Sequence, residues 1–196
     1  ARAEILPRFR ALTEAEIAAK SGPDDLVTEA DTAAEAMIAR GLSRLFPEAL
    51  IVGEEAAEAD PRLPDRIGEA GTSFIVDPVD GTWNFARGLP CFGVIVAMCR
   101  AGSPVWAMIY DPIMDDWLSA AEDRPTRHER PGHPPRPVQM GPAREIAEMS
   151  GFVPLYLVPE ERRPALAALF PTFRRAASLR CSAHEYRLLA QGHVDF

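Results

Sequence analysis

Two carboxylates three residues apart follow an apolar run in the middle of the chain. Asp77 comes directly after this run, which predicts a buried strand, and Asp80 follows shortly after. Side chains at the carboxyl end of a strand gather where α/β proteins place their sites. These two carboxylates and a turned-out carbonyl of Val79 are the hard oxygen ligands that suit Mg²⁺. Gly81 permits an unusual backbone angle, and a short helix starting at Thr82 would offer N–H groups to a phosphate.

A second acidic pair also stands at the end of a predicted strand. Glu54 and Glu55 follow the apolar residues 50–52. The alternative to a metal-binding role for this pair is two exposed surface glutamates. The alternative for residues 77–81 is a plain turn, because Asp-Pro and Asp-Gly are common turn dipeptides. Asp31 precedes a predicted helix and could simply cap it. The two carboxylate-bearing strand ends together favour a metal site over a turn.

The elements that would position these residues alternate between helices and strands. An apolar pattern of helical spacing follows Thr32, which makes a capping box with Glu35, and Ser182 makes another with Glu185. Because two strands form a hairpin while others are separated by helices, we expect a mixed sheet. The proline-rich residues 123–137 predict a surface connection, and the chain ends in what resembles the start of a strand. The predicted helices are 3–19, Thr32 to Pro47, 160–170 and 182–191, and the predicted strands are 49–53, 73–76, 92–99, 104–110 and 117–121.

Composition excludes several classes of function. The 196 residues carry a net charge of −8, and no basic stripe suggests a nucleic-acid partner. No apolar run could cross a bilayer and no signal peptide is evident, so a cytoplasmic protein without a membrane partner is expected. An acidic protein that handles an anion needs a bound divalent cation to reverse its local field.

The cysteines and histidines are not expected to form a metal site. The three cysteines fit neither a disulfide framework nor a Cys-x-x-Cys motif, which predicts reduced thiols in or near the core. The four histidines lack metal-ligand spacing. His128 and His133 lie in the proline-rich segment and are expected to be solvated, and a structural role is favoured for His184. No Gly-x-Ser-x-Gly or P-loop pattern supports a serine hydrolase or a nucleotide kinase.

Three motifs resemble those of the inositol monophosphatase family, a group of Mg²⁺-dependent, lithium-sensitive phosphatases. They occur in the family's order and approximate spacing, and the resemblance extends from about Lys20 to the end of the chain. It implies an α/β (α+β) fold, a layered αβαβα sandwich with mixed sheets of the sugar-phosphatase type. The three motifs are residues 25–31, Glu54-Glu55 and the stretch from Asp77 to Phe85, with further matches at 88–90, 110–112 and 180–183.

The resemblance also implies a metal site. Glu54, Asp77 and the Val79 carbonyl would hold one Mg²⁺, and Asp77 and Asp80 would hold a second. Glu54 could face a third, weaker site, which gives two or three ions in all. Lys20 matches a position in a loop near the active site.

Further residues acquire catalytic or substrate roles from the same resemblance. Thr82, polarised by Asp31, would help to deprotonate a water at the metal, with Glu54 part of the same catalytic group. The N–H groups of Gly81 and Thr82 would bind phosphate oxygens beside Asp80. Ala183 would lie near the hydroxyl-bearing part of the substrate.

The implied activity is Mg²⁺-dependent hydrolysis of a small phosphorylated polyol or sugar, with inositol monophosphate the leading substrate. Histidinol phosphate, fructose 1,6-bisphosphate, adenosine 3′,5′-bisphosphate and NADP are alternatives. The family's later Trp-Asp motif does not occur before Phe196, so we expect a single phosphatase domain, 1–196, that lacks its C-terminal part. A non-catalytic, family-derived binding or regulatory protein and an acidic cation-binding protein are the hypotheses from other classes. Members of the family are usually homodimers.

Overall fold

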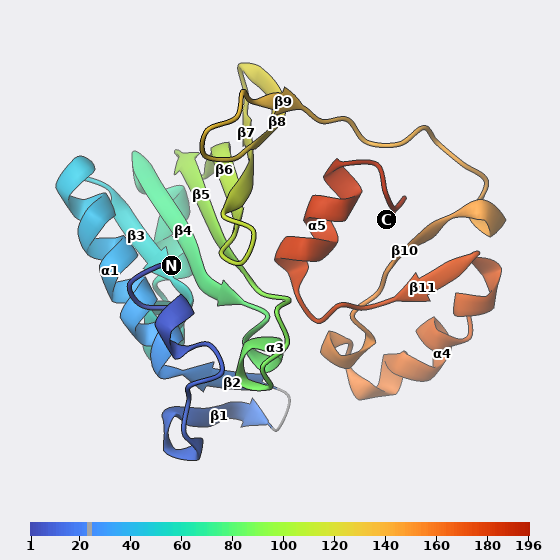
Figure 1. The fold of residues 1–196 in the computed structure, drawn as a ribbon, viewed down its shortest axis with the longest axis horizontal. Helices are drawn as coiled ribbons and strands as arrows, with labels where there is room; N and C mark the ends of the chain where they lie inside the picture. The colour runs from blue at the N-terminus through green and yellow to red at the C-terminus, as the bar shows by residue number, and fades with distance from the viewer. Residues whose placement is uncertain (23–24) are drawn as a thin grey trace.

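A seven-stranded mixed sheet forms the centre of the protein in this computed structural model, which describes residues 1–22 and 25–196 (Figure 1). The strands lie in the order β3-β4-β5-β6-β7-β8-β9. Only β3 and β4 run parallel, and each later pair is antiparallel. The mixed sheet predicted from the sequence is therefore confirmed. Its strands are β3 (Leu50–Gly53), β4 (Thr72–Asp80), β5 (Gly93–Arg100), β6 (Ser103–Asp111), β7 (Asp116–Ala121), β8 (Arg124–Glu129) and β9 (Arg136–Pro137).

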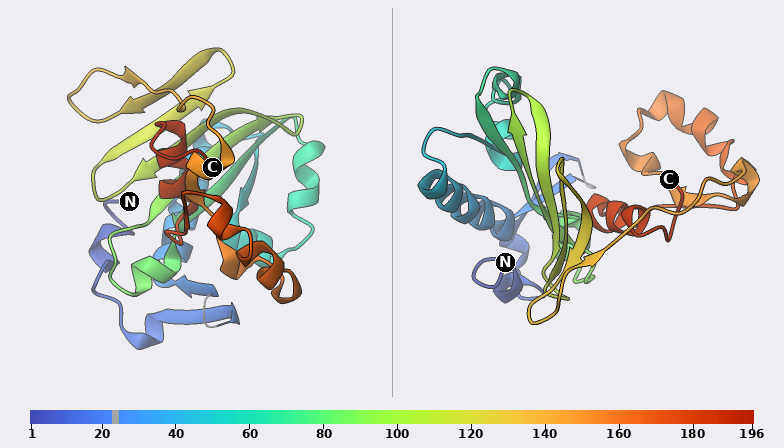
Figure 2. Two further views of the ribbon diagram at one scale, coloured as in Figure 1. Left: turned by 90° about the vertical axis from the view of Figure 1, so that its right-hand side faces the viewer. Right: turned by 90° about the horizontal axis from the view of Figure 1, so that it is seen from above.

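Helices and a second sheet are stacked on the two faces of this central sheet. Helix α1 (Glu29–Leu45) packs on β3 and β4, and α5 (Ser182–Ala190) covers the opposite face against β5 and β6. Beyond α5 lie a parallel pair, β10 (Ser150–Phe152) and β11 (Arg175–Ala177), and then α4 (Arg163–Ala167), as Figures 1 and 2 show. The expected αβαβα layering is thus confirmed.

Helix α1 begins three residues before the predicted start at Thr32. Its N-cap is Thr28, whose backbone N–H donates to Oδ2 of Asp31 at 2.9 Å. The predicted box between Thr32 and Glu35 does not form, because the Glu35 carboxylate accepts from the backbone N–H groups of Glu55 at 2.8 Å and Ala56 at 3.0 Å. Glu35 therefore satisfies free donors in the first turn of α2 (Glu54–Ala59).

The predicted helix at 3–19 is wrong. The segment makes 3₁₀ turns at Leu6–Arg8 and Glu14–Glu16 and then enters β1 (Ile17–Gly22), which pairs antiparallel with β2 (Asp25–Thr28). Strand pairing overrides the helix propensity of an alanine-rich stretch here. Two residues of the predicted break between these elements, Pro23 and Asp24, lie outside the described part of the chain.

Two other segments differ from the prediction: residues 123–137 are more regular than expected, and residues 160–170 are less regular. Residues 123–137 extend the central sheet as β8 and β9, and His128 contacts the Asp116 carboxylate at 2.9 Å instead of being solvated. The predicted helix at 160–170 is split into short turns around α4. At the chain end, backbone hydrogen bonds join Asp195 and Phe196 to β10, although no strand is formed there.

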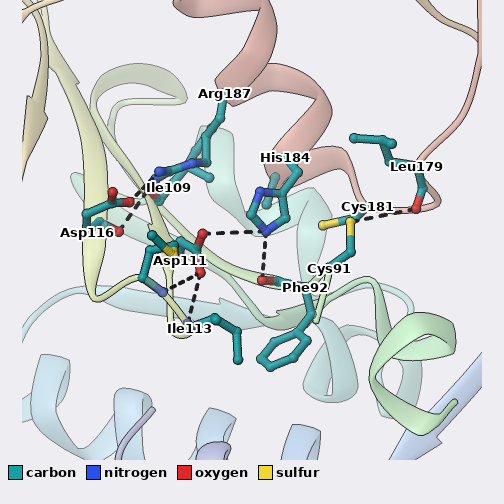
Figure 3. Close-up of polar contacts among 12 residues, drawn as sticks. Cys91, Phe92, Ile109, Asp111, Ile113, Asp116, Leu179, Cys181, His184 and Arg187 are labelled. Carbon is teal, nitrogen blue, oxygen red and sulfur yellow. Dashed lines mark hydrogen bonds and ion pairs between the residues drawn. The ribbon is translucent and has the colours of Figure 1, made fainter. Parts of the chain in front are cut away.

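Helix α5 is tied to the sheet by a buried arginine. Arg187 donates to the Ile109 carbonyl at 3.1 Å and to the Asp116 carboxylate (Figure 3). The predicted capping box at the start of α5 is absent, because Glu185 instead accepts from the backbone N–H of Leu179 at 2.6 Å. Arg187 therefore ties α5 to β6 and β7, and Glu185 ties it to the segment that precedes the helix.

Aromatic packing supports the loop that follows β4. Phe85 and Phe92 are almost fully buried, and their rings meet edge to face with centroids 4.9 Å apart. Phe9 packs against both rings. In the described ranges, no helix has the length and apolar character needed to span a membrane.

Candidate active site

The two carboxylates of the central loop lie at the end of β4, where the strand is irregular. The β4–β5 register shifts between Asp77 and Asp80. Such an irregularity bends a strand and re-aims its side chains, and it is common beside active sites. The Val79 carbonyl accepts from the hydroxyl of Thr82 at 2.9 Å. Three predicted metal ligands therefore come from four consecutive residues of one bent strand.

Asp77 lies in a site that disfavours its own negative charge. Within the described residues, its buried Oδ1 atom has no hydrogen-bond partner. Burial first, and then the charges of Glu54, Asp80 and Asp31, raise the pKa of Asp77 to about 8. A divalent cation would relieve both effects, and the predicted ligands, three carboxylates and the Val79 carbonyl, offer only oxygen atoms, which Mg²⁺ prefers. The residues present thus fit the metal that the sequence motifs imply.

Glu54 opens α2 and shares a lysine with its neighbours. The Lys20 ammonium lies 2.9 Å from Oε1 of Glu54 and 2.7 Å from Oε1 of Glu55, and Glu58 is the third partner at 3.1 Å. Burial alone would lower the pKa of Lys20, but the hydrogen bonds from these glutamates raise it above its usual value. Lys20 therefore stays charged and offsets part of the negative charge beside the carboxylates.

Asp31 both caps a helix and contacts the predicted catalytic threonine. Its Oδ2 accepts from Thr28, and its Oδ1 accepts from the Thr82 hydroxyl at 3.0 Å. Burial raises the pKa of this fully buried carboxyl, while the hydrogen bonds from Thr28 and Thr82 oppose the shift. The capping role and the contact with Thr82 are thus compatible, because each uses a different oxygen.

Gly81 makes the turn between β4 and helix α3 (Thr82–Ala86). Its φ of +88° lies in the left-handed region, which favours glycine. A Cβ at this position would also lie 2.9 Å from the Cys91 carbonyl oxygen. The turn brings Gly81 and Thr82 to the wall of a cavity, and phosphate binding by their N–H groups stays a prediction.

Asp80 is held by the segment that leads into α5. Its Oδ2 accepts from the backbone N–H of Ala183 at 2.6 Å and from the thiol of Cys181 at 3.0 Å. Ala183 is fully buried, so it touches the site through its backbone. Its predicted contact with a substrate stays a prediction. The Cys181 contact was not foreseen, because sequence spacing gave it no partner.

A cavity of about 500 Å³ lies in front of these groups. Arg180 lies on its wall; it belongs to the matched stretch 180–183, but no role was predicted for it from the sequence. Its guanidinium lies 4.3 Å from the ring centroid of Trp83 and 4.6 Å from that of Tyr156. The cavity lining contains Glu54, Asp80, Gly81, Thr82, Trp83, Tyr156, Leu157, Arg163, Arg180 and Ser182, together with residues of the β1–β2 hairpin.

Asn84 joins the two sides of this site. Its side-chain amide donates to the carbonyls of Cys91 at 2.9 Å and Leu179 at 2.8 Å, and Arg180 offers a third carbonyl at 3.3 Å. Asn84 is part of the sequence motif after Asp77, but its partners, 7 to 96 residues away in the chain, become visible only in the fold.

The chain resembles inositol monophosphatases and SuhB proteins. It is 38% identical over 106 residues to inositol monophosphatase 2 of Solanum lycopersicum and 34% identical over 103 residues to the Nus factor SuhB of Escherichia coli. Each match covers 53% of this chain but only 38% and 36% of the respective relative. The match thus spans little more than a third of the length of these relatives.

A solved structure shares the fold. The IMPase of Thermotoga maritima superimposes with a TM-score of 0.76 at 22% identity, and the match covers 97% of this chain and 68% of that one. The sequence model of the inositol monophosphatase family matches residues 1–196. The carboxylate loop, the layered fold and this full-length match lead to one conclusion: the chain belongs to the inositol monophosphatase family.

Proposed function

We propose that this protein hydrolyses a small phosphate monoester in a Mg²⁺-dependent reaction, with inositol monophosphate as the leading substrate. The observation that carries the proposal is the convergence of Glu54, Asp77 and Asp80 beside the Thr82–Asp31 pair. Carboxylates crowded around a buried oxygen suit a divalent cation. A paired hydroxyl next to them suits the activation of water.

The metal ligands would be Glu54, Asp77, Asp80 and the carbonyl of Val79, holding two or three Mg²⁺ ions. When bound, Mg²⁺ offsets the charge of the phosphate and makes a nearby water easier to deprotonate. The chain itself orients these oxygens through Lys20 at Glu54 and through Ala183 and Cys181 at Asp80. Such positioning matters because phosphoryl transfer depends mainly on geometry and charge stabilisation.

Thr82 would orient and help to deprotonate the attacking water. Its hydroxyl donates to Oδ1 of Asp31 at 3.0 Å, which leaves the lone pairs of the oxygen free to accept a hydrogen bond from water. The negative charge of the buried Asp31 carboxylate would stabilise the partial positive charge that develops on this hydroxyl when it accepts a proton from water. Neither residue needs to form a covalent intermediate with the phosphate.

The cavity fits a small anionic ligand. Its volume of about 500 Å³ lies in the range typical of sites for small molecules. Arg163 and Arg180 contribute positive charge to its wall, while Trp83 and Tyr156 hold the Arg180 guanidinium between two rings. These features suit a phosphorylated polyol, but the alternative phosphate monoesters named above share the same chemistry.

A second proposal is that the protein acts as a binding or regulatory protein without catalysis. The observation that favours it is the similarity to proteins named Nus factor SuhB, a name that describes no phosphatase activity. Under both proposals we expect a cytoplasmic homodimer without a membrane or nucleic-acid ligand at the carboxylate site.

Phosphate release from a panel of small phosphomonoesters, with and without Mg²⁺, tests the two proposals. We expect release only with Mg²⁺, and a rise of the melting temperature in its presence. Asp80→Asn should abolish both effects, whereas Asp65→Asn, at an exposed position, should retain both. A Mg²⁺-dependent thermal shift without turnover of any substrate would favour the regulatory proposal. Turnover retained by Asp80→Asn would contradict the ligand set.

A further inference from the structure

Two thiols and an imidazole form a cluster beside Asp80. Cys91, Cys181 and His184 each offer one ligand atom, and these atoms all lie within 4.8 Å of one another. Cys91 precedes β5, Cys181 is the N-cap of α5, and His184 lies in the first turn of α5 (Figure 3). Sequence spacing predicted no such cluster, because 90 residues separate the two cysteines (181 − 91).

The surroundings of this cluster are polar and anionic, unlike those of a thiol that only fills space in an apolar core. The Cys181 thiol donates to Oδ2 of Asp80 at 3.0 Å, although the residue is only 1% exposed. Nε2 of His184 lies 3.2 Å from the Phe92 carbonyl oxygen and 3.9 Å from Oδ2 of Asp111. Acceptor oxygens and negative charge therefore surround both ends of the cluster.

We propose that Cys91, Cys181 and His184 form a binding site for a soft divalent cation of the Zn²⁺ class. Zinc sites use thiolate and imidazole ligands at about 2.3 and 2.0–2.1 Å, and three protein ligands leave a fourth position for water. Ligand atoms within 4.8 Å of one another can reach such a geometry through small side-chain movements. Phe92 and Asp111 would orient the imidazole, as outer partners of metal-bound histidines commonly do.

The site is chemically distinct from the carboxylate site next to it. Thiolates select soft cations, whereas Mg²⁺ prefers oxygen ligands and is not expected to compete here. Cys181 connects the two sites, because its thiol hydrogen bond to Asp80 is lost when the sulfur ligates a metal. The binding itself is independent of phosphatase activity. Any effect of the bound cation on turnover rests in addition on the proposed function.

Titration with Co²⁺, which gives a near-ultraviolet charge-transfer band when thiolates ligate it, tests the site. The purified protein is reduced with a phosphine to keep the cysteines as thiols, and it is titrated in excess Mg²⁺ to mask the carboxylates. We expect one equivalent of Co²⁺ with the thiolate band, which Zn²⁺ then displaces. Absence of the band in the reduced, folded protein would overturn the proposal.

Variants assign the ligands. Cys91→Ser changes a half-buried ligand and should remove the band or raise the dissociation constant for Co²⁺ by about tenfold or more. Loss of a residue that only supports a ligand already weakens metal binding by about tenfold, so loss of a ligand should cost at least as much. Cys99→Ser is the matched control, because Cys99 is a buried free thiol outside the cluster, and it should bind Co²⁺ as the unchanged protein does. An unchanged thiolate band together with unchanged Co²⁺ affinity in folded Cys91→Ser would refute the assignment.

His184→Gln tests the proposed site independently if Cys91→Ser fails to fold, as judged by circular dichroism. The glutamine cannot supply the imidazole, so the band should shift and Co²⁺ affinity should fall. Equal affinity in folded His184→Gln would exclude the histidine as a ligand and overturn the three-ligand site. Because no readout involves phosphate release, a failed phosphatase assay and a failed metal titration remain distinguishable.

Discussion

The hydroxyl of Thr82 lies 3.0 Å from Oδ1 of Asp31 and 2.9 Å from the carbonyl oxygen of Val79. A hydroxyl has one proton, so it can donate fully to only one of these acceptors at a time. Asp31 is buried and its other oxygen is fixed by Thr28, which leaves Oδ1 free to accept from Thr82. The geometry therefore couples the helix cap to the candidate catalytic hydroxyl.

Removing the hydroxyl should reduce turnover without unfolding the protein. We expect Thr82→Ala to lower kcat by about 10²–10⁴-fold, the usual contribution of a positioned acid–base group. Thr82→Ser keeps the hydroxyl and should retain much of the activity. Steady-state kinetics with the best substrate of the panel measure both. Equal rates for the alanine and serine variants would rule out a role for the hydroxyl.

The stability of the metal-free protein should depend on the ionisation of Asp77. Its folded-state pKa of about 8 exceeds the ordinary value of 3.8, so the folded state binds the proton more tightly. The stabilising contribution of this group is therefore present below about pH 4 and is lost as the pH rises towards about 8. Asp77→Asn cannot titrate and should flatten this part of the profile.

Urea unfolding in a chelator, from about pH 5 to about pH 8, measures this difference between the two proteins. Saturating Mg²⁺ should reverse the trend for the unchanged protein, because the cation binds the ionised carboxylate. Parallel profiles for the unchanged protein and Asp77→Asn would show that Asp77 keeps an ordinary pKa.

Asn84 should contribute to stability through its carbonyl partners. Asn84→Ala leaves the carbonyls of Cys91 and Leu179 without their donor, and we expect a loss of about 1–3 kcal/mol in the free energy of unfolding. Asn84→Asp should cost more, because it places a carboxylate against carbonyl oxygens. Chemical denaturation compares them with Gln139→Ala, an exposed control. A change no larger than that of the control would count against the bridge.

Arg187 should anchor α5 to the sheet. Arg187→Met leaves the Asp116 carboxylate without its buried cationic partner, which typically costs about 3–5 kcal/mol. Arg66→Met, at an exposed position, should have little effect. Thermal unfolding measures both variants. A melting temperature of Arg187→Met equal to that of the control would mean that packing alone holds α5.

The sequence by itself determined the type of fold and the central loop. The apolar runs before Glu54 and Asp77 are local signals, since short apolar runs bounded by turn residues are typical of buried strands. The Asp77–Phe85 motif likewise carries its own turn, because Gly81 supplies the left-handed angle that the bend needs. These features depend on neighbours in the chain, so they were predictable.

Only the tertiary structure decided which distant groups meet. The end of the predicted N-terminal helix forms β1 instead, because β2 offers it backbone partners. Glu35 does not make its predicted capping box, because its carboxylate accepts hydrogen bonds from the first turn of α2. Cys181 reaches Asp80 across 101 residues, and no local pattern encodes such a contact. The physical reason is that hydrogen bonds and ion pairs between distant segments depend on how whole layers pack, which periodicity and spacing do not specify.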